Sequence, residues 1–164
     1  MAQIIQPVKI SKQSIFLTVV SLCIITGLML LNAHQGDVIK VYILAGLIVG
    51  ICGFALWYAP QAIEVDSSSL KIRRALRTKT IPLEQIRSVQ PWAPGTEYHK
   101  VCASGGWFGY WGWFSSKAVG KFFGYFGESD RCFMVTLADG RHYLLGCADY
   151  APIVDFINNH TSTK

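Results

Sequence analysis

The sequence lacks the residue patterns that carry the common chemistries of enzymes and metalloproteins. Its five cysteines include no C-x-x-C pair, and its four histidines are scattered without the spacing of zinc ligands. It contains no G-x-S-x-G, no H-E-x-x-H and no glycine-rich phosphate-binding motif. Its acidic residues are isolated rather than paired. We therefore expect no catalysis, no metal ion and no cofactor, and we expect the thiols to be reduced.

Charge is also missing from two long apolar runs, residues 15 to 31 and 41 to 58, which contain 17 and 18 residues. As helices they would be roughly 26 to 27 Å long, close to the roughly 30 Å hydrocarbon core of a bilayer. Neither run keeps a polar face, which disfavours a helical hairpin buried in a soluble protein. A cleaved signal peptide explains the first run less well, because a second run follows at once. The sequence predicts a transmembrane hairpin.

Basic residues flank the outer ends of both runs. Lys9 and Lys12 precede the first run without an acidic neighbour, and five Lys or Arg residues lie between positions 71 and 79, after the second. The connecting loop contains Lys40, opposed by Asp37. Because basic residues concentrate on the cytoplasmic side of membrane proteins, both termini are expected in the cytoplasm.

These boundaries divide the chain into a cytoplasmic N-terminal segment (1–14), the transmembrane hairpin (15–58), a cytoplasmic domain (61–160) and a short tail (161–164). The whole chain has a formal charge of +5 and a pI near 9.0. Residues 61–164 contain 12 Lys or Arg and 9 Asp or Glu, a net charge of only +3 (12 minus 9). So small an excess argues against nucleic-acid binding.

Beyond the second run the hydrophobic period changes from helical to alternating. Residues 62 to 73 alternate around a serine turn and predict a β-hairpin. Residues 78 to 86 predict a strand that Pro82 stops, with a short turn starting at Glu84 and Gln85. Residues 132 to 145 predict a second hairpin around an Asp-Gly turn, a pair that supplies the positive φ of tight turns. Residues 148 to 159 predict a helix, with Asp149 as its N-cap.

The order of four motifs resembles the bacterial pleckstrin-homology-like (PH-like) domain family, in its membrane-anchored type. The motifs are Y-x-P-x-x-I-x-V at 58–65, IPL-x-x-I at 81–86, DGR-x-Y-x-L at 139–145 and D-x-x-x-x-x-x-F-I at 149–157. The resemblance spans roughly residues 41 to 160. It implies a seven-stranded, strongly bent antiparallel barrel capped by a C-terminal helix, without catalysis. The expected fold is a membrane-anchored α+β protein, a transmembrane hairpin followed by this small PH-like barrel.

Two stretches of the cytoplasmic part are candidate sites. The first is a basic cluster that could hold anionic lipid headgroups or could be a solvated cytoplasmic flank. It comprises Lys71, Arg73, Arg74, Arg77 and Lys79.

The second stretch, residues 104 to 127, holds ten aromatic residues and seven glycines. About half of the aromatic side chains should form the core of two strands. The rest should rest in the membrane interface or cover a neighbouring protein. The candidate contact residues are Trp107, Phe108, Tyr110, Trp111, Trp113 and Phe114.

Together these features predict a binding or scaffold module of the bacterial inner membrane, with anionic lipids or another membrane protein as partners. The alternative is a small membrane enzyme, or a subunit of one, that uses the aromatic stretch as an acyl-chain pocket. Gly46 and Gly50 match the small-xxx-small pattern of helix dimers, which suggests self-association through that face.

Overall fold

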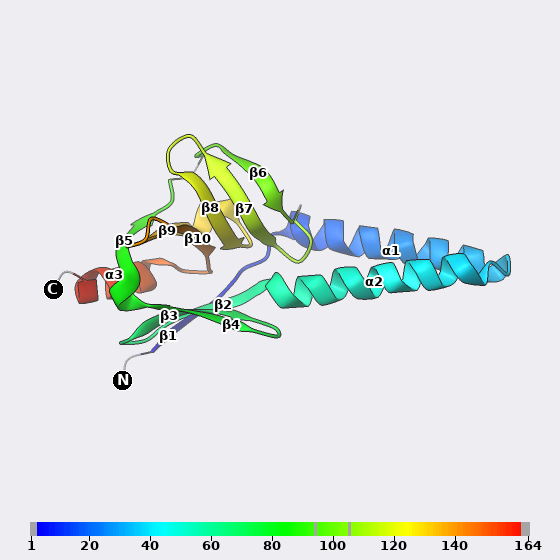
Figure 1. Ribbon diagram of the computed structural model, residues 1–164, viewed down its shortest axis with the longest axis horizontal. Helices are drawn as coiled ribbons and strands as arrows, with labels where there is room; N and C mark the ends of the chain where they lie inside the picture. Colours follow the sequence, from blue (N-terminus) through cyan, green and yellow to red (C-terminus); the bar gives the residue numbers. More distant parts are fainter. Residues whose placement is uncertain (1–2, 94, 105, 162–164) are drawn as a thin grey trace.

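Two long helices run side by side away from a β-rich part of the molecule (Figure 1). The structure is a computed structural model that describes residues 3–93, 95–104 and 106–161. The helices, α1 (Lys12–His34) and α2 (Val38–Tyr58), contain the two apolar runs that were expected to be helical. Both are long and apolar enough to cross a membrane.

Each long helix begins at a polar cap. The Ser11 hydroxyl accepts a hydrogen bond from the Ser14 N–H at 3.1 Å, and the Asp37 carboxylate accepts one from the Lys40 N–H at 3.3 Å. Because Ser11 caps it, α1 starts three residues before the apolar run. The buried residues of the two helices, Ser14, Thr18 and Ala55, lie near the β-rich part. Elsewhere the helices turn apolar side chains outward.

The first sheet is antiparallel, and its strand order follows the chain: β1 (Ile4–Pro7), β2 (Pro60–Val65), β3 (Ser69–Arg74) and β4 (Thr78–Pro82). The predicted hairpin at 62 to 73 is confirmed as β2 and β3. Its turn is fixed by Asp66, whose Oδ1 accepts hydrogen bonds from two backbone N–H groups at 2.8 Å. Strand β1 precedes α1 but pairs with β2, which follows α2. In the sequence, the helical hairpin is therefore an insertion between two strands that are neighbours in the sheet.

The second sheet contains six strands in the order β5-β9-β10-β8-β7-β6. Their bounds are β5 (Ile86–Pro91), β6 (Tyr98–Ala103), β7 (Tyr110–Ser116), β8 (Gly120–Phe126), β9 (Cys132–Leu137) and β10 (His142–Gly146). The predicted hairpin at 132 to 145 is confirmed as β9 and β10, and Gly140 has the positive φ that its turn requires. Strands β7 and β8, from the aromatic stretch, form a further hairpin.

The predicted seven-stranded antiparallel barrel is wrong. The described residues form ten strands in two separate sheets, and β10 runs parallel to β8. Pro82 has no N–H to continue the ladder of β4, and a 3-10 turn at Leu83–Gln85 redirects the chain. Strand β5 therefore pairs with β9 instead of β4. Strand β10 lies between β9 and β8 in the sheet, antiparallel to β9 and parallel to β8.

The predicted C-terminal helix is confirmed as α3 (Ala151–Thr161), and Figure 1 shows it at the end of the β-rich part opposite the long helices. The Asp149 carboxylate accepts a hydrogen bond from the Ala151 N–H at 3.1 Å. Ile153 and Ile157 are fully buried, and the helix packs on β5 and β2. Residue 161 of the predicted tail (161–164) is the last residue of α3, and residues 162–164 lie outside the described residues.

Side chains are buried on both faces of the second sheet. One cluster lies between the two sheets and α3. The other covers the opposite face of the second sheet and comprises Trp92, Phe114, Phe122, Phe126, Cys132, Met134 and Leu144. The two sheets therefore enclose a core without forming a barrel.

Candidate functional site

Strand alternation divides the basic cluster between two faces of the first sheet. In β3, Leu70 and Ile72 are fully buried, and Arg74 continues the same alternate positions. In β4, Lys79 lies opposite Ile72 in the register and so shares that inner face. Lys71 and Arg73 lie on the outer face. The five basic residues are therefore not one site.

The outer pair is held by acidic residues. Lys71 Nζ lies 2.7 Å from Asp66 Oδ2 and 3.8 Å from Glu64 Oε1, and Arg73 lies 3.6 Å from Glu64 Oε2. Glu64 is only 6% exposed and also accepts a hydrogen bond from Gln3. The hydrogen bond from Lys71 lowers the pKa of Asp66, which keeps that carboxyl ionised. These ion pairs offset the charge of Lys71 and Arg73.

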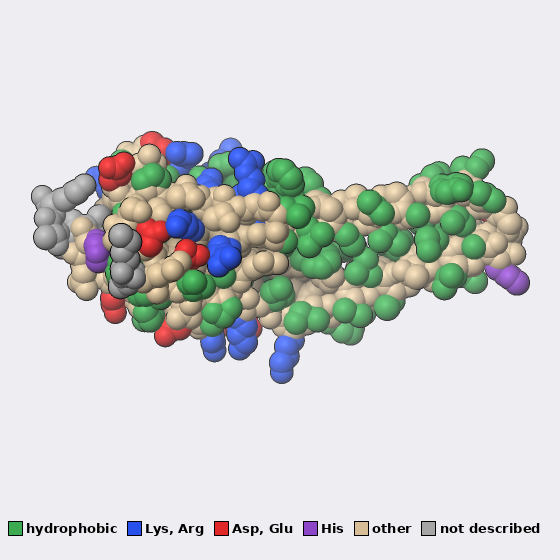
Figure 2. Space-filling view, turned by 90° about the horizontal axis from the view of Figure 1, so that it is seen from below, with side chains coloured by type: hydrophobic (Ala, Val, Ile, Leu, Met, Phe, Trp, Pro, Cys, Tyr) green, Lys and Arg blue, Asp and Glu red, His purple; other side chains and the backbone are tan. Residues whose placement is uncertain are grey.

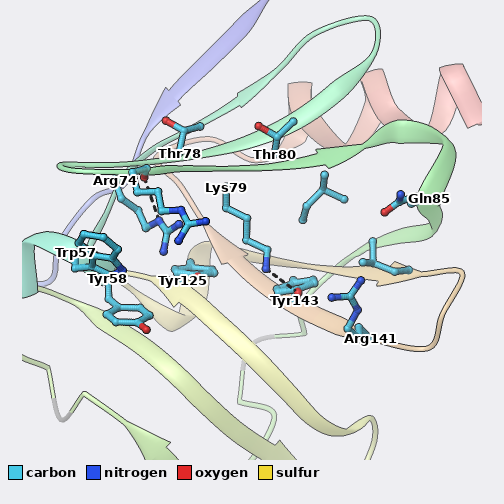
Figure 3. Close-up of a pocket in the computed structure, with 13 residues that line it drawn as sticks. Trp57, Tyr58, Arg74, Thr78, Lys79, Thr80, Gln85, Tyr125, Arg141 and Tyr143 are labelled. Atoms are coloured by element: carbon cyan, nitrogen blue, oxygen red, sulfur yellow. Dashed lines mark hydrogen bonds between the residues drawn. The ribbon is translucent and has the colours of Figure 1, made fainter. Parts of the chain in front are cut away.

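The inner basic residues line a pocket of about 440 Å³ between the two sheets (Figure 3). Arg74, Arg77 and Lys79 come from the β3–β4 hairpin, and Arg141 comes from the turn before β10. Figure 3 shows Lys79 pointing across the pocket, and its Nζ donates to the Tyr143 hydroxyl at 2.9 Å. We refer to this space as the basic pocket.

The basic pocket carries positive charge without a matching carboxylate in its wall. Among the described residues that line it there is no Asp or Glu. Arg141 is paired outside the pocket with Asp139 at 2.6 Å. For Arg74, Arg77 and Lys79, the described part of the chain supplies no ion pair. Three cations thus face a space large enough for a phosphate group.

Aromatic rings position these cations. Lys79 Nζ lies 4.5 Å from the centre of the Tyr143 ring, and the Arg74 guanidinium lies 5.7 Å from that of Tyr125. Arg74 Nε also donates to the Arg77 carbonyl at 3.1 Å, which ties its side chain to the β3–β4 turn. Burial raises the pKa of Tyr125, so its hydroxyl stays protonated. Arg74 and Lys79 are therefore held in place before any ligand binds.

The basic pocket adjoins the end of a long apolar helix. Trp57 and Tyr58, the last two residues of α2, line it together with the cations. Figure 2 shows Lys and Arg side chains at the end of the β-rich part from which the helices emerge. Trp and Tyr are enriched where membrane-spanning helices meet the lipid headgroups.

The candidate aromatic residues have different environments. Trp111 and Phe114 are buried, Trp107, Phe108 and Tyr110 are half-buried, and Trp113 is 46% exposed. Of all ten aromatic residues in the stretch 104–127, five are buried, which agrees with the expectation that about half of them form the core.

Several aromatic residues contact the long helices. The Trp111 ring stacks on Tyr58 with centroids 5.3 Å apart and lies 5.4 Å from Phe54. The Phe108 N–H donates to the Thr18 hydroxyl at 3.2 Å. The aromatic stretch thus packs the β-rich part against the start of α1 and the end of α2.

Comparison with known families decides the class of the β-rich part. A family model described as a bacterial PH domain matches residues 61–161. The chain belongs to the bacterial PH domain family. The two long apolar helices precede this bacterial PH domain. No curated protein and no solved structure matches the chain significantly.

Buried thiols offer the bacterial PH domain no ready nucleophile. Burial raises the pKa of Cys147 to about 12 and raises the pKa of Cys132 still further, so both thiols stay protonated at neutral pH. In the described ranges no three His, Cys, Asp or Glu side chains gather as metal ligands do. The absence of catalysis remains an expectation.

The sequence alone missed part of the basic pocket. Arg141, Tyr125 and Tyr143 are far from the basic cluster in sequence, and the fold brings them to it. The division of the cluster was visible in the sequence, because Arg74 continues the apolar alternation of β3. Gly46 and Gly50 lie on α2 with nothing within 4 Å of an added Cβ, and self-association through them stays a prediction.

Proposed function

We propose that this protein is a non-catalytic, membrane-anchored binding module whose basic pocket holds the phosphate of an anionic lipid headgroup. One observation carries the proposal: three cations without an acidic partner in the described structure face a pocket bordered by Trp57 and Tyr58 at the end of a membrane-length helix. A phosphodiester at the headgroup level would meet these cations without leaving the membrane.

Charge and shape both favour a phosphate. Each Lys or Arg near an anionic membrane surface contributes about 1 kcal/mol to attraction. Arginine also offers a planar fork of donors that matches phosphate oxygens, whereas lysine acts as a point charge. Arg74 and Arg77 with Lys79 supply both kinds of contact. The helices would hold the pocket permanently at the surface, which raises the effective concentration of headgroups around it.

This proposal places the bacterial PH domain and both termini in the cytoplasm of a bacterial cell, with the protein in the cytoplasmic membrane. Gln35 lies in the loop between the helices. We expect the thiol of a Gln35→Cys variant to react with a membrane-impermeant maleimide in intact cells. Cys102 is exposed on β6 and should react only after the cells are permeabilised. A Cys102→Ser variant identifies that signal. Labelling of Cys102 in intact cells would contradict this orientation and would place the bacterial PH domain outside the cytoplasm.

Lipid binding is tested with the full chain in detergent, by native mass spectrometry with phosphatidylglycerol and phosphatidylcholine. We expect a preference for phosphatidylglycerol that the Arg74→Gln/Lys79→Gln variant loses. Removing two cations at about 1 kcal/mol each should weaken binding by about 2 kcal/mol, roughly 30-fold. The matched control is Lys117→Gln/Lys121→Gln, which removes the same charge from two exposed residues at the tip of the β7–β8 hairpin, one in the turn and one at the start of β8. Equal losses in both variants would contradict a specific pocket.

A protein partner is the second candidate, and one exposed patch favours it. Val101 and Trp113 are 54% and 46% exposed and lie on neighbouring strands β6 and β7. Strand β6 is also an edge strand, whose free backbone groups can pair with another chain. If phosphatidylglycerol shows no preference, crosslinking from a photoreactive residue at position 113 is the next experiment.

A further inference from the structure

The basic pocket is the first of three hollows that follow α2 toward its middle. Tyr58 lines the basic pocket and also a second hollow of about 350 Å³, which it shares with Phe54 and Trp111. Phe54 and Trp111 in turn line a third hollow of about 480 Å³, beside Gly50. Tyr58, Phe54 and Gly50 are four residues apart, so each step is roughly 6 Å along the helix. The hollows therefore share their walls.

The chemistry of the walls changes along this series. The basic pocket is cationic, and the next hollow is walled by aromatic rings. The third hollow, which we call the apolar groove, is lined by Gly50, Ile51, Phe54, Ala55, Ser104, Trp107 and Trp111. Its described lining residues include a single hydroxyl side chain and no charged one. This order of cation, aromatic ring and apolar wall is the order of headgroup, interface and hydrocarbon in a lipid leaflet.

Gly50 leaves open space beside the wall of the apolar groove. A Cβ added at Gly50 would meet nothing within 4 Å, and Phe54 and Trp107 line the groove together with Gly50. The groove lies along a helix long and apolar enough to cross a membrane, so it opens toward hydrocarbon when that helix is inserted. An acyl chain is the occupant whose chemistry fits these walls at that depth.

We propose that the basic pocket and the apolar groove together bind one anionic phospholipid, with its phosphate among Arg74, Arg77 and Lys79 and one acyl chain along α2 at Gly50. This inference rests on the proposed function and adds to it the recognition of the chain. A lipid held at both ends is selected by its headgroup charge and retained by its hydrocarbon. The free headgroup should bind more weakly than the whole lipid.

The test fills the groove and leaves the cations in place. Gly50→Leu puts a side chain into the apolar groove, whereas Gly46→Leu puts the same side chain one turn away, also where nothing lies within 4 Å. Both variants disrupt the Gly46-x-x-x-Gly50 pattern equally, so a change in self-association cannot explain a difference between them. Binding of phosphatidylglycerol and of glycerol 1-phosphate to the full chain is measured for each variant and for Arg74→Gln/Lys79→Gln.

We expect Gly50→Leu to weaken phosphatidylglycerol binding about tenfold, the equivalent of roughly two methylene groups losing their contacts, while glycerol 1-phosphate binding is unchanged. Gly46→Leu should resemble the wild type for both probes. Equal affinity of Gly50→Leu and Gly46→Leu for the lipid would overturn the acyl-chain site. So would glycerol 1-phosphate binding as tightly as the lipid, which would indicate a site for soluble anions.

The outcomes also separate this inference from the proposed function. If Arg74→Gln/Lys79→Gln loses the lipid and Gly50→Leu keeps it, the headgroup site stands and the acyl-chain site fails. If Arg74→Gln/Lys79→Gln keeps full affinity for phosphatidylglycerol, the headgroup site itself fails. Brominated acyl chains give a second readout, because they quench Trp107 and Trp111 on contact. That quenching should fall in Gly50→Leu and persist in Gly46→Leu.

Discussion

Phe114→Ala is expected to lower the free energy of unfolding of the bacterial PH domain by about 3–5 kcal/mol, the usual cost of removing a buried phenylalanine. Phe114 is fully buried on the outer face of the second sheet. Its ring centre lies 5.4 Å from that of Phe126, 5.6 Å from Tyr98 and 5.8 Å from Phe122. Removing the ring leaves a cavity that strands β7 and β8 cannot close, because both are fixed in the sheet.

The control is the neighbouring residue on the same strand. Trp113 points to the opposite face of β7, is 46% exposed, and has one ring neighbour in the described structure, Phe123 at 5.2 Å. Trp113→Ala should cost about 1 kcal/mol, the range of a single aromatic pair. Both values are measured on the full chain in detergent by urea unfolding followed by near-UV circular dichroism. Similar losses for the two variants would mean that the aromatic cluster around Phe114 is not a packed core.

Gly127→Ala is expected to cost about 3 kcal/mol by forcing the start of α1 away from the second sheet. A Cβ at Gly127 would overlap the Lys9 carbonyl oxygen and lie 2.7 Å from its carbon and 2.8 Å from the Ile10 Cα. These are backbone atoms, so no rotamer change relieves the overlap, and overpacking of this kind costs about 1–3 kcal/mol. The Ser11 N–H also donates to the Gly127 carbonyl at 3.3 Å, a bond worth about 1 kcal/mol.

Gly120→Ala separates this overlap from a general effect of replacing glycine. Gly120 has φ of +77°, but a Cβ there would meet nothing within 4 Å. Its cost should be about 1–2 kcal/mol of left-handed strain. The two variants are compared by the urea midpoint and by hydrogen exchange of the Ser11 amide, which should be faster in Gly127→Ala alone. Unchanged exchange at Ser11 would show that the start of α1 does not depend on Gly127.

The Gly127 contact also bears on how the basic pocket is held. Residues before α1 contact Gly127, the residue that follows β8, and pair with the first sheet through β1, and α2 leads directly into β2. Both long helices are thus joined to strands of the first sheet. A membrane that fixes the helices would thereby fix the orientation of the basic pocket beside Trp57 and Tyr58.

Local sequence determined the elements that depend on neighbouring residues. The two long helices, the hairpins β2–β3 and β9–β10 and helix α3 were all predicted, because hydrophobic period, turn residues and capping groups act over a few positions. The alternation of β3 also indicates that the basic cluster is divided between two faces, since Arg74 is at the next alternate position after the apolar Leu70 and Ile72. The family resemblance was confirmed as well.

Tertiary structure decided what depends on contacts between distant residues. No local pattern shows that β1 pairs with β2 across the whole helical hairpin, or that β10 settles beside β8. The expected barrel failed for this reason, because closure depends on pairing between strand edges. Arg141 and Tyr143 line the basic pocket although Arg141 lies 67 positions after Arg74 and Tyr143 lies 64 positions after Lys79 (141 minus 74 and 143 minus 79). Long-range packing of two sheets, which no short window records, placed them there.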